Sequence, residues 1–259
     1  MPDTHELYMP LSELQVIGVP GIPEVATGVN LGTLIAQSIG KAGLEVKDKD
    51  ILVVAQKIVS KAEGQVLDLA DVEPSPLAHR WATTHGKDAR LVEIVLRESR
   101  RLLRMERGLL IVETWHGFVC ANARVDTSNT PRGKVTLLPK DSDSSAAQIR
   151  QEMEREFGVQ LAVIVSDTFG RPWREGLVNV ALGVAGMQPF VDYRGQMDGF
   201  GRKLQVTRIA VADELASTAE LVMGKTKGVP VALIRGMAYP PGEGHGRQIL
   251  RSSERDLFR

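Results

Sequence analysis

Three polar segments of the chain place carboxylates, hydroxyls and cationic side chains after apolar runs. QKIVSKAEG follows DILVVA, ARVDTSNTP comes after LLIVETW, and SDTFGRPWR directly follows LAVIV. Such apolar runs are typical of buried strands, and side chains just beyond a buried strand sit on a rigid support that faces solvent or ligand. We expect these segments to be loops that carry a site, with candidate residues Lys57, Ser60, Lys61, Asp126, Ser128, Asn129, Asp167, Thr168, Arg171 and Arg174.

Asp126 and Asp167 are the candidate metal ligands. Magnesium and manganese ions prefer carboxylate and hydroxyl oxygens and keep positions open for phosphate, so two aspartates converging from different loops would suit a metal–nucleotide site. Lysine and arginine would then hold the phosphate charge, lysine as a point charge and arginine as a planar fork. An aspartate after a strand also serves as a turn or capping residue, so a purely structural role for each stays open.

The familiar nucleotide-binding motifs are missing. The segment MGKT (residues 223–226) resembles the end of a P-loop, but that motif requires glycine where the chain has Ala219. GEGHG (residues 242–246) does not match the Rossmann fingerprint and follows two prolines rather than a strand. The lone Cys120 is a weak candidate for a catalytic thiol. We therefore expect a fold that is neither of the P-loop nor of the Rossmann type.

Strands and helices alternate along the chain. Apolar runs predict strands at residues 14–19, 50–55, 109–115, 134–139, 161–165 and 229–236. The spacing of apolar residues predicts helices at residues 31–42, 73–86, 88–104, 141–158 and 208–224, and a buried helix is predicted at 176–186. An Asn cap and a Gly stop mark the first helix, Pro74 and Pro76 mark the start of the second, and an Asp/Ser start with a Gly stop marks the helix at 141–158. Residues 117–133 and 192–205 are expected to be loops. These elements predict an α+β fold.

The composition excludes several classes of partner. Thirty-two basic and thirty-two acidic residues give zero net charge, so we expect neither nucleic acid nor an anionic membrane surface as a partner. No stretch is apolar for long enough to span a bilayer, and the first ten residues lack the pattern of a signal peptide. A single cysteine fits a reducing compartment, and we expect a cytoplasmic protein.

Seven segments in a fixed order resemble the coenzyme F420-0:L-glutamate ligase family, over about residues 14 to 240. They are GIPEV, VVAQKIVSKAEG, CANARVDTSN, SDTFGRPWR, GMQPFVDYRGQMDGFGRKL, VADELASTAELVMGK and VPVALIRG. The resemblance implies a GTP-dependent ligase that joins L-glutamate to the terminal carboxylate of coenzyme F420-0 through an acyl phosphate. It also implies that further glutamates are added by γ-linkage.

The resemblance further implies a two-lobed α+β fold in which residues 1–259 act as one functional unit. It implies a homodimer that uses a divalent ion, Mg²⁺ or Mn²⁺, together with K⁺. Some relatives carry a fused nitroreductase-like domain. Since the chain ends at Arg259, we expect no such domain here.

Residue by residue, the resemblance places a first metal on Asp126 and Asp167 and a second on Thr168. We expect Lys61 and an arginine of the SDTFGRPWR segment, Arg171 or Arg174, to stabilise the phosphates and the acceptor carboxylate. Lys225 stands where some relatives have an oxygen ligand for the second metal, so either that ion is held otherwise or Lys225 contacts phosphate in its place. The implied nucleotide contacts are Ile22, Pro23, Glu24, Val25, Gln56, Lys57, Lys61, Asn129, Met223, Gly224, Lys225, Thr226, Lys227, Gly228, Val229 and Pro230.

Two rival functions remain open. One is another ATP- or GTP-dependent ligase that joins a different acid to an amine. The other is a non-catalytic nucleotide-binding module, which would keep the phosphate-binding segments without needing Asp126 and Asp167 together. The residues alone do not distinguish GTP from ATP, and they do not fix how many glutamates are added or which three-carbon acid the coenzyme contains.

Overall fold

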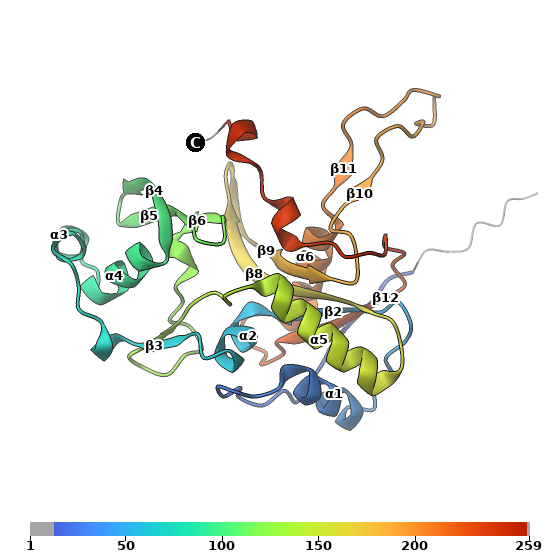
Figure 1. Cartoon of the computed structure of the whole chain (residues 1–259), viewed down its shortest axis with the longest axis horizontal. Helices are drawn as coiled ribbons and strands as arrows, with labels where there is room; N and C mark the ends of the chain where they lie inside the picture. Colours follow the sequence, from blue (N-terminus) through green and yellow to red (C-terminus); the bar gives the residue numbers. More distant parts are fainter. Residues whose placement is uncertain (1–12, 258–259) are drawn as a thin grey trace, which may run out of the picture.

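A mixed five-stranded sheet forms the centre of the molecule (Figure 1). The computed structural model describes residues 13–257, so the N-terminal segment in which we expect no signal peptide lies outside the described residues. The strand order is β1-β12-β2-β8-β9, with β2 and β8 parallel and the other neighbours antiparallel. The strands are β1 (Gln15–Gly18), β2 (Ile51–Ala55), β8 (Ala162–Arg171), β9 (Arg174–Ala185) and β12 (Val231–Arg235).

The central strands are apolar throughout because helices cover both faces of the sheet. Along β2, Leu52 and Val54 point to one hydrophobic core, while Ile51 and Val53 point to the other. Helices α1 (Leu31–Lys41) and α5 (Ser142–Phe157) pack on the first face, and α6 (Val211–Met223) packs on the second (Figure 1). This arrangement explains the unbroken apolar runs in the sequence.

The predicted boundaries of α1 and α5 are confirmed, whereas the helix predicted from residue 208 begins only at Val211, because residues 208–209 form strand β11. Asn30 caps α1 by accepting a hydrogen bond from the backbone N–H of Thr33. Asp141 caps α5 in the same way, and Gly158 ends it in the left-handed conformation that glycine adopts without penalty. The α+β fold is therefore confirmed, and its mixed sheet differs from the parallel sheets of P-loop and Rossmann proteins.

A small lobe, formed by residues 76–124, packs around a core of its own (Figure 1). Two helices cover the antiparallel sheet β4-β5-β6. Its elements are α3 (Pro76–His85), α4 (Ala89–Arg97), β4 (Ser99–Glu106), β5 (Leu109–Thr114), β6 (Val119–Ala121) and the turn Asn122–Arg124. The predicted helix at 88–104 is thus wrong in its second half, which is strand β4, and the predicted loop at 117–133 contains strand β6.

Two further predictions are corrected by the structure. SDTFGRPWR is not a loop: Ser166 to Arg171 continue strand β8, which turns at residues 172–173 into β9. The predicted buried helix at 176–186 is the paired strand β9 itself. A short apolar run with glycines is compatible with either a helix or a strand. Here it forms a strand, because β8 and β9 pair along the long hairpin and hydrogen-bond each other's backbone N–H and C=O groups.

The segment QKIVSKAEG is also not a loop, because helix α2 (Gln56–Ala62) begins directly after β2. The short pair β3 (Val66–Asp68) and β7 (Lys134–Thr136) links the small lobe to the main sheet. An arm formed by β10 (Val191–Asp192), β11 (Arg208–Ile209) and the loop between them projects from the body (Figure 1). Short 3-10 turns lie at Leu69–Asp71, Gly246–Ile249 and Ser253–Arg255.

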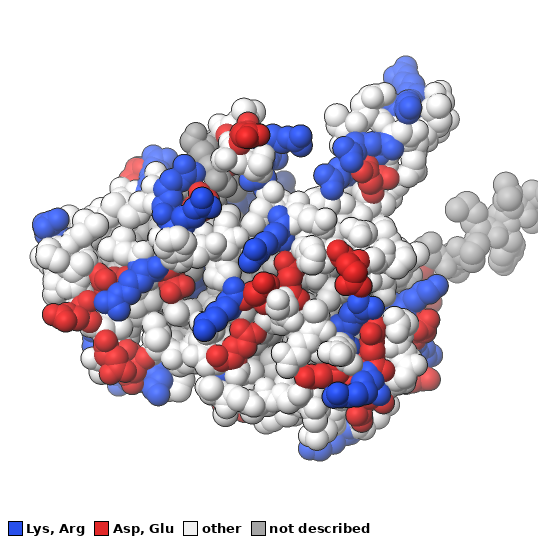
Figure 2. Space-filling model, in the orientation of Figure 1, with Lys and Arg blue, Asp and Glu red and all other residues white. Residues whose placement is uncertain are grey.

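The surface matches the balanced composition. Figure 2 shows acidic and basic side chains interspersed over the visible face of the molecule. Among residues 13–257, no helix is both long enough and apolar enough to cross a membrane.

Candidate functional site

Four segments far apart in the chain meet at one edge of the central sheet. Strands β2 and β8 are parallel, with Ala55 paired to Ser166, so the start of α2 and residue Asp167 emerge side by side. Strand β12 is antiparallel to β2 and begins at this edge, which brings the loop of residues 224–230 to it. Strand β1 ends there as well, followed by residues 22–25. The topology of the sheet therefore assembles the site.

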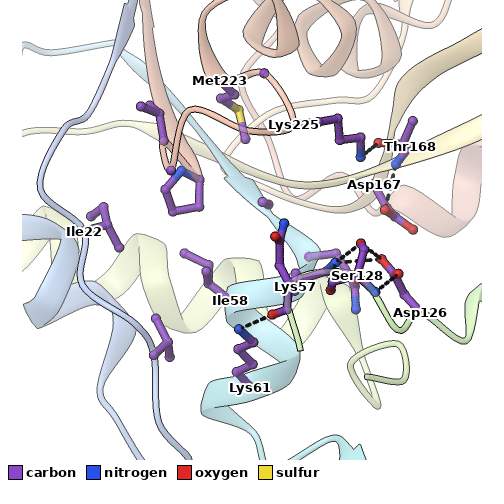
Figure 3. A pocket seen from close by; sticks show the side chains of 18 of the residues that line it. Ile22, Lys57, Ile58, Lys61, Asp126, Ser128, Asp167, Thr168, Met223 and Lys225 are labelled. Carbon is purple, nitrogen blue, oxygen red and sulfur yellow. Dashed lines mark hydrogen bonds and ion pairs between the residues drawn. The ribbon is translucent and has the colours of Figure 1, made fainter. Parts of the chain in front are cut away.

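A cavity of about 590 Å³ lies at this edge (Figure 3). Its walls contain most of the residues expected to bind metal and nucleotide, together with several that sequence reasoning did not select. The expected residues in the walls are Ile22, Pro23, Glu24, Val25, Gln56, Lys57, Lys61, Asp126, Ser128, Asn129, Asp167, Thr168, Met223, Gly224, Lys225, Thr226, Gly228, Val229 and Pro230. The additional wall residues are Ala55, Ile58, Thr130, Pro131, Ser166, Asn179 and Glu220.

Asp126 reaches the cavity from a loop that is anchored to strand β7. Its backbone forms a two-way hydrogen-bonded bridge with Thr136, which fixes where the side chain lies. The carboxylate accepts from the backbone N–H of Ser128, with 2.7 Å between N and Oδ1. Lys57 Nζ lies 2.7 Å from Oδ2 of the same carboxylate (Figure 3).

The Lys57 ammonium and the Ser128 amide keep Asp126 ionised. Burial by itself raises the pKa of the Asp126 carboxyl, but the hydrogen bonds from Lys57 and Ser128 outweigh burial and lower that pKa below its ordinary value. Lys57 also donates to the Ser128 carbonyl oxygen and hydroxyl, at 2.5 and 2.7 Å. The result is a carboxylate that stays negative at neutral pH on the cavity wall.

Asp167 is held by Arg124, a residue that sequence reasoning missed. Arg124 Nε donates to Asp167 Oδ2 at 2.7 Å, and the guanidinium carbon lies 5.0 Å from the centre of the Phe169 ring. Asn122, Ala123 and Arg124 have φ values of 52°, 50° and 59°, so the chain makes a left-handed turn without glycine. Such a turn is strained for L-residues, and strain of this kind gathers at functional sites.

The amide of Gln56 is oriented by buried contacts, and the ammonium of Lys61 by partly buried ones. Lys61 forms an ion pair with Glu24 and donates to the Asn129 carbonyl oxygen at 2.7 Å. Gln56 donates to the Leu137 carbonyl oxygen at 2.9 Å, which directs its amide toward the protein interior. Lys61 is therefore a cation at the cavity wall, whereas the amide nitrogen of Gln56 is engaged in holding the fold together.

A chain of polar contacts runs behind Thr168. Its hydroxyl lies 2.8 Å from Asn179 Oδ1, and Asn179 Nδ2 donates to Glu220 at 3.0 Å. The Lys225 ammonium contacts the Thr168 hydroxyl from the cavity side (Figure 3). Sequence reasoning missed Asn179 because it lay in the supposed helix at 176–186. It missed Glu220 because no local motif marks a single acid on an amphipathic helix.

Four expected site residues are not in the cavity walls, and one of them, Ser60, is fully buried. Arg171 lies near the hairpin turn and donates to the Glu175 carbonyl oxygen at 3.3 Å, while Arg174 is exposed on β9. Lys227 shares the loop with Lys225 but is absent from the walls. Conversely, the buried Ser166 hydroxyl lines the cavity without a hydrogen-bond partner among the described residues.

The donor set in the cavity fits a hard divalent cation. Asp126 and Asp167 lie on the same side of the cavity, and their oxygens are the ligands that Mg²⁺ and Mn²⁺ prefer (Figure 3). No cluster of three or more His, Cys, Asp or Glu side chains suited to a metal occurs within residues 13–257. A cation here would hence take two carboxylates from the protein, and phosphate and water oxygens would complete its coordination, as is common for Mg²⁺.

Comparison with known proteins gives one consistent result. The family model described as F420-0:Gamma-glutamyl ligase matches residues 21–236. A coenzyme F420:L-glutamate ligase of Methanothermobacter thermautotrophicus is 47% identical over 95% of this chain and 99% of its own length. Ligases of the same name from Methanocaldococcus jannaschii and Methanopyrus kandleri are each 43% identical, over 95% and 96% of this chain and 97% and 99% of their own lengths.

Proposed function

The chain belongs to the F420-0:gamma-glutamyl ligase family, and on that premise we propose that it joins L-glutamate to the terminal carboxylate of coenzyme F420-0 using GTP. The observation that carries the proposal is the meeting of Asp126, Asp167 and three lysines in one cavity. Carboxylates suited to a divalent ion beside ammonium groups form a site for a metal–triphosphate complex. The cavity volume of about 590 Å³ lies within the range of small-molecule and cofactor sites.

Activation by phosphoryl transfer is needed because a carboxylate carbon is a poor electrophile and its oxygen a poor leaving group. In the proposed reaction, a carboxylate oxygen of F420-0 attacks the γ-phosphorus, the bond to the β-phosphate oxygen breaks, and GDP leaves. The glutamate amine then attacks the acyl carbon of the resulting acyl phosphate. Inorganic phosphate departs with the electrons of the C–O bond, and the nitrogen loses a proton to give the amide.

In the proposed site, the aspartates of the cavity bind the metal and the lysines bind the phosphates. Asp126 and Asp167 would hold the divalent ion, which when bound neutralises phosphate charge during phosphoryl transfer. Lys57 and Lys61 line the cavity on the α2 side and would hold phosphate oxygens. Arg124 holds Asp167 in place from outside the cavity walls. Because Arg171 and Arg174 lie outside those walls, we propose that the lysines, rather than the two arginines of the hairpin, neutralise the charge of the phosphates.

The same proposal includes four further features of the protein. They are γ-linked addition of further glutamates, assistance by K⁺, a homodimer and a cytoplasmic location. Large exposed apolar side chains on the hairpin and on the arm support self-association, since solvent-exposed apolar patches mark interaction sites. They include Trp173, Leu177, Phe200 and Val206, the last two 94% and 84% exposed.

Product analysis tests the proposal. GDP and phosphate should be released only when GTP, F420-0 and L-glutamate are all present, and the mass of the product should exceed that of F420-0 by one or more glutamyl residues. F420-0 labelled with ¹⁸O in its carboxylate should pass one label to the released phosphate, because the acyl phosphate oxygen leaves with it. Nucleotide binding without turnover would favour the non-catalytic module, and turnover with a different acid would favour the other ligase.

A further inference from the structure

The hydroxyl of Thr168 is fixed in one orientation by the residues behind it. Glu220 is a carboxylate acceptor, so the side of the Asn179 amide that faces it must be the NH₂ group, and the distance of 3.0 Å agrees. The carbonyl oxygen of the same amide must then face Thr168, at 2.8 Å from its hydroxyl oxygen. Because an amide carbonyl only accepts, the Thr168 hydroxyl has to donate its proton to Asn179.

This orientation turns the lone pairs of Thr168 toward the cavity. A hydroxyl whose single proton is committed can act only as an acceptor toward its other neighbours. Thr168 is 6% exposed and Asn179 is 4% exposed, so water does not compete for the arrangement. The Glu220, Asn179 and Thr168 relay therefore creates a position for a cation in front of Thr168.

The Lys225 ammonium takes that position. It contacts the Thr168 hydroxyl from the cavity side (Figure 3). The other two lysines in the cavity walls have carboxylate partners, Lys57 with Asp126 and Lys61 with Glu24. Among the described residues, Lys225 forms no ion pair with a carboxylate. Its positive charge is consequently left for an anion inside the cavity.

A divalent ion does not fit at the same position. To bind Thr168 it would have to lie against the lone pairs that Lys225 now contacts, within a few ångströms of its ammonium group. Lys57 likewise lies close to Asp126, but there the carboxylate offsets its charge, whereas the charge of Lys225 has no such carboxylate partner among the described residues and would repel a divalent ion strongly. A charged lysine has no lone pair to offer a metal. The expectation of a second metal on Thr168 therefore disagrees with the residues around it.

We propose that the Lys225 ammonium, seated on Thr168, replaces a second divalent cation, so that this chain binds its nucleotide with a single divalent ion per site. The inference rests on the proposed function, since it requires a phosphate-bearing nucleotide in the cavity. Lys225 would contact a phosphate oxygen directly, on the side of the cavity opposite Lys57 and Lys61. Its positive charge would neutralise phosphate charge at that position, as a second metal ion would.

Counting bound metal tests the inference with a readout other than activity. The intact protein would be dialysed to equilibrium against Mn²⁺ and the β,γ-imido analogue of GTP, and bound Mn²⁺ would be measured per bound nucleotide. We expect a ratio of one for the wild type. We expect a ratio of two for Lys225→Gln, because the substitution removes the repelling charge and supplies an amide oxygen as a ligand.

Lys227→Gln is the matched control, because it removes a charge from the same loop but not from the cavity wall. Its ratio should stay at one. At limiting Mn²⁺, Lys225→Gln should bind the analogue roughly tenfold more weakly than the wild type, the loss typical of a charged hydrogen bond. High Mn²⁺ should restore that affinity.

A ratio of two for the wild type, or of one for Lys225→Gln, would overturn the inference while leaving the proposed function intact. Failure of the wild type to bind the analogue at all would instead overturn the proposed function and the inference with it. The wild-type ratio requires no substitution, so the inference can be refuted even if the variant does not fold.

Discussion

Arg124 and Asp167 form an ion pair beside the cavity, with 2.7 Å between Nε and Oδ2, although they are separated by 43 positions in the chain. One belongs to a left-handed turn at the edge of the small lobe and the other to strand β8 of the central sheet. The pair thus joins the two parts of the fold at the candidate metal ligand. Both side chains are mostly shielded from solvent, so their attraction is screened less than that of a surface pair.

Removing Arg124 should destabilise the protein through Asp167. Arg124→Ala leaves a partly buried carboxylate without its partner, and we expect a loss of about 3 kcal/mol in the free energy of unfolding, measured by urea titration. Asp167→Asn in the same background removes the uncompensated charge and should recover part of that loss. Strictly additive effects of the two substitutions would show that the pair is not coupled.

Loss of either candidate metal ligand should slow the proposed reaction. Asp167→Asn or Asp126→Asn should each lower kcat/KM by roughly 10²- to 10³-fold, since each removes a charged contact that acts on the transition state. GDP release with both substrates present is the readout. Asp88→Asn is the matched control, because Asp88 caps α4 far from the cavity and asparagine caps equally well. Near-normal ligation by Asp167→Asn at saturating metal would remove Asp167 from the site.

The pKa of Asp126 predicts a component of acid sensitivity. The lowered folded-state pKa means that the carboxylate contributes stability fully above its ordinary value of 3.8 and loses it as the pH falls through the folded value. The free energy of unfolding should therefore decline less steeply below about pH 4 in Asp126→Asn than in the wild type. Lys57→Met should flatten the same limb, since it removes the partner. Unchanged slopes in both variants would contradict this assignment.

Cys120 should be inert in the folded protein. Burial raises the pKa of its thiol to about 12, so almost no thiolate exists at pH 8. Labelling with iodoacetamide at that pH should be very slow in the native protein and fast in urea. Rapid labelling under native conditions would show that β6 opens readily, and it would reopen the question of a catalytic thiol.

Close packing of strand β9 on helix α5 should be intolerant of an added methyl group. A Cβ at Gly183 would lie 2.0 Å from the Ser142 carbonyl oxygen, so Gly183→Ala should cost about 2 to 3 kcal/mol of stability. Gly40→Ala is the control, because nothing lies within 4 Å of its Cβ position in α1. It should stabilise the protein by about 0.5 to 1 kcal/mol, since alanine favours helix. Equal effects in thermal melts would contradict the packing.

Local patterns were enough to predict four of the five strands of the main sheet and the helices that cover it. DILVVA is apolar because it is buried on both faces, and Asn30 and Gly158 mark helix ends through their own backbone chemistry. The hairpin of β8 and β9 was not predictable in this way. Its connection is Pro172 and Trp173, which carry none of the Asn-Gly signal of a two-residue turn, and the apolar run after it has no distinctive period.

The candidate site was predicted where segments carry their own motif and missed where the fold brings single residues together. Lys57 and Asp167 each follow an apolar run, and Asp126 lies in a polar segment without periodicity, so their positions were visible in the sequence. Arg124 faces Asp167 only because residues 122–124 adopt positive φ values without a glycine to announce them. Asn179 and Glu220 contact each other only once β9 lies against α6. Partners of this kind depend on tertiary geometry.

The most direct test of the proposed metal–nucleotide site is the anomalous scattering of Mn²⁺ in crystals grown with the β,γ-imido analogue of GTP. A peak about 2 Å from oxygens of both Asp126 and Asp167, bridged to the phosphates, is the expected result. A nucleotide bound elsewhere on the molecule, or a peak that touches neither aspartate, would contradict the assignment of this cavity as the active site.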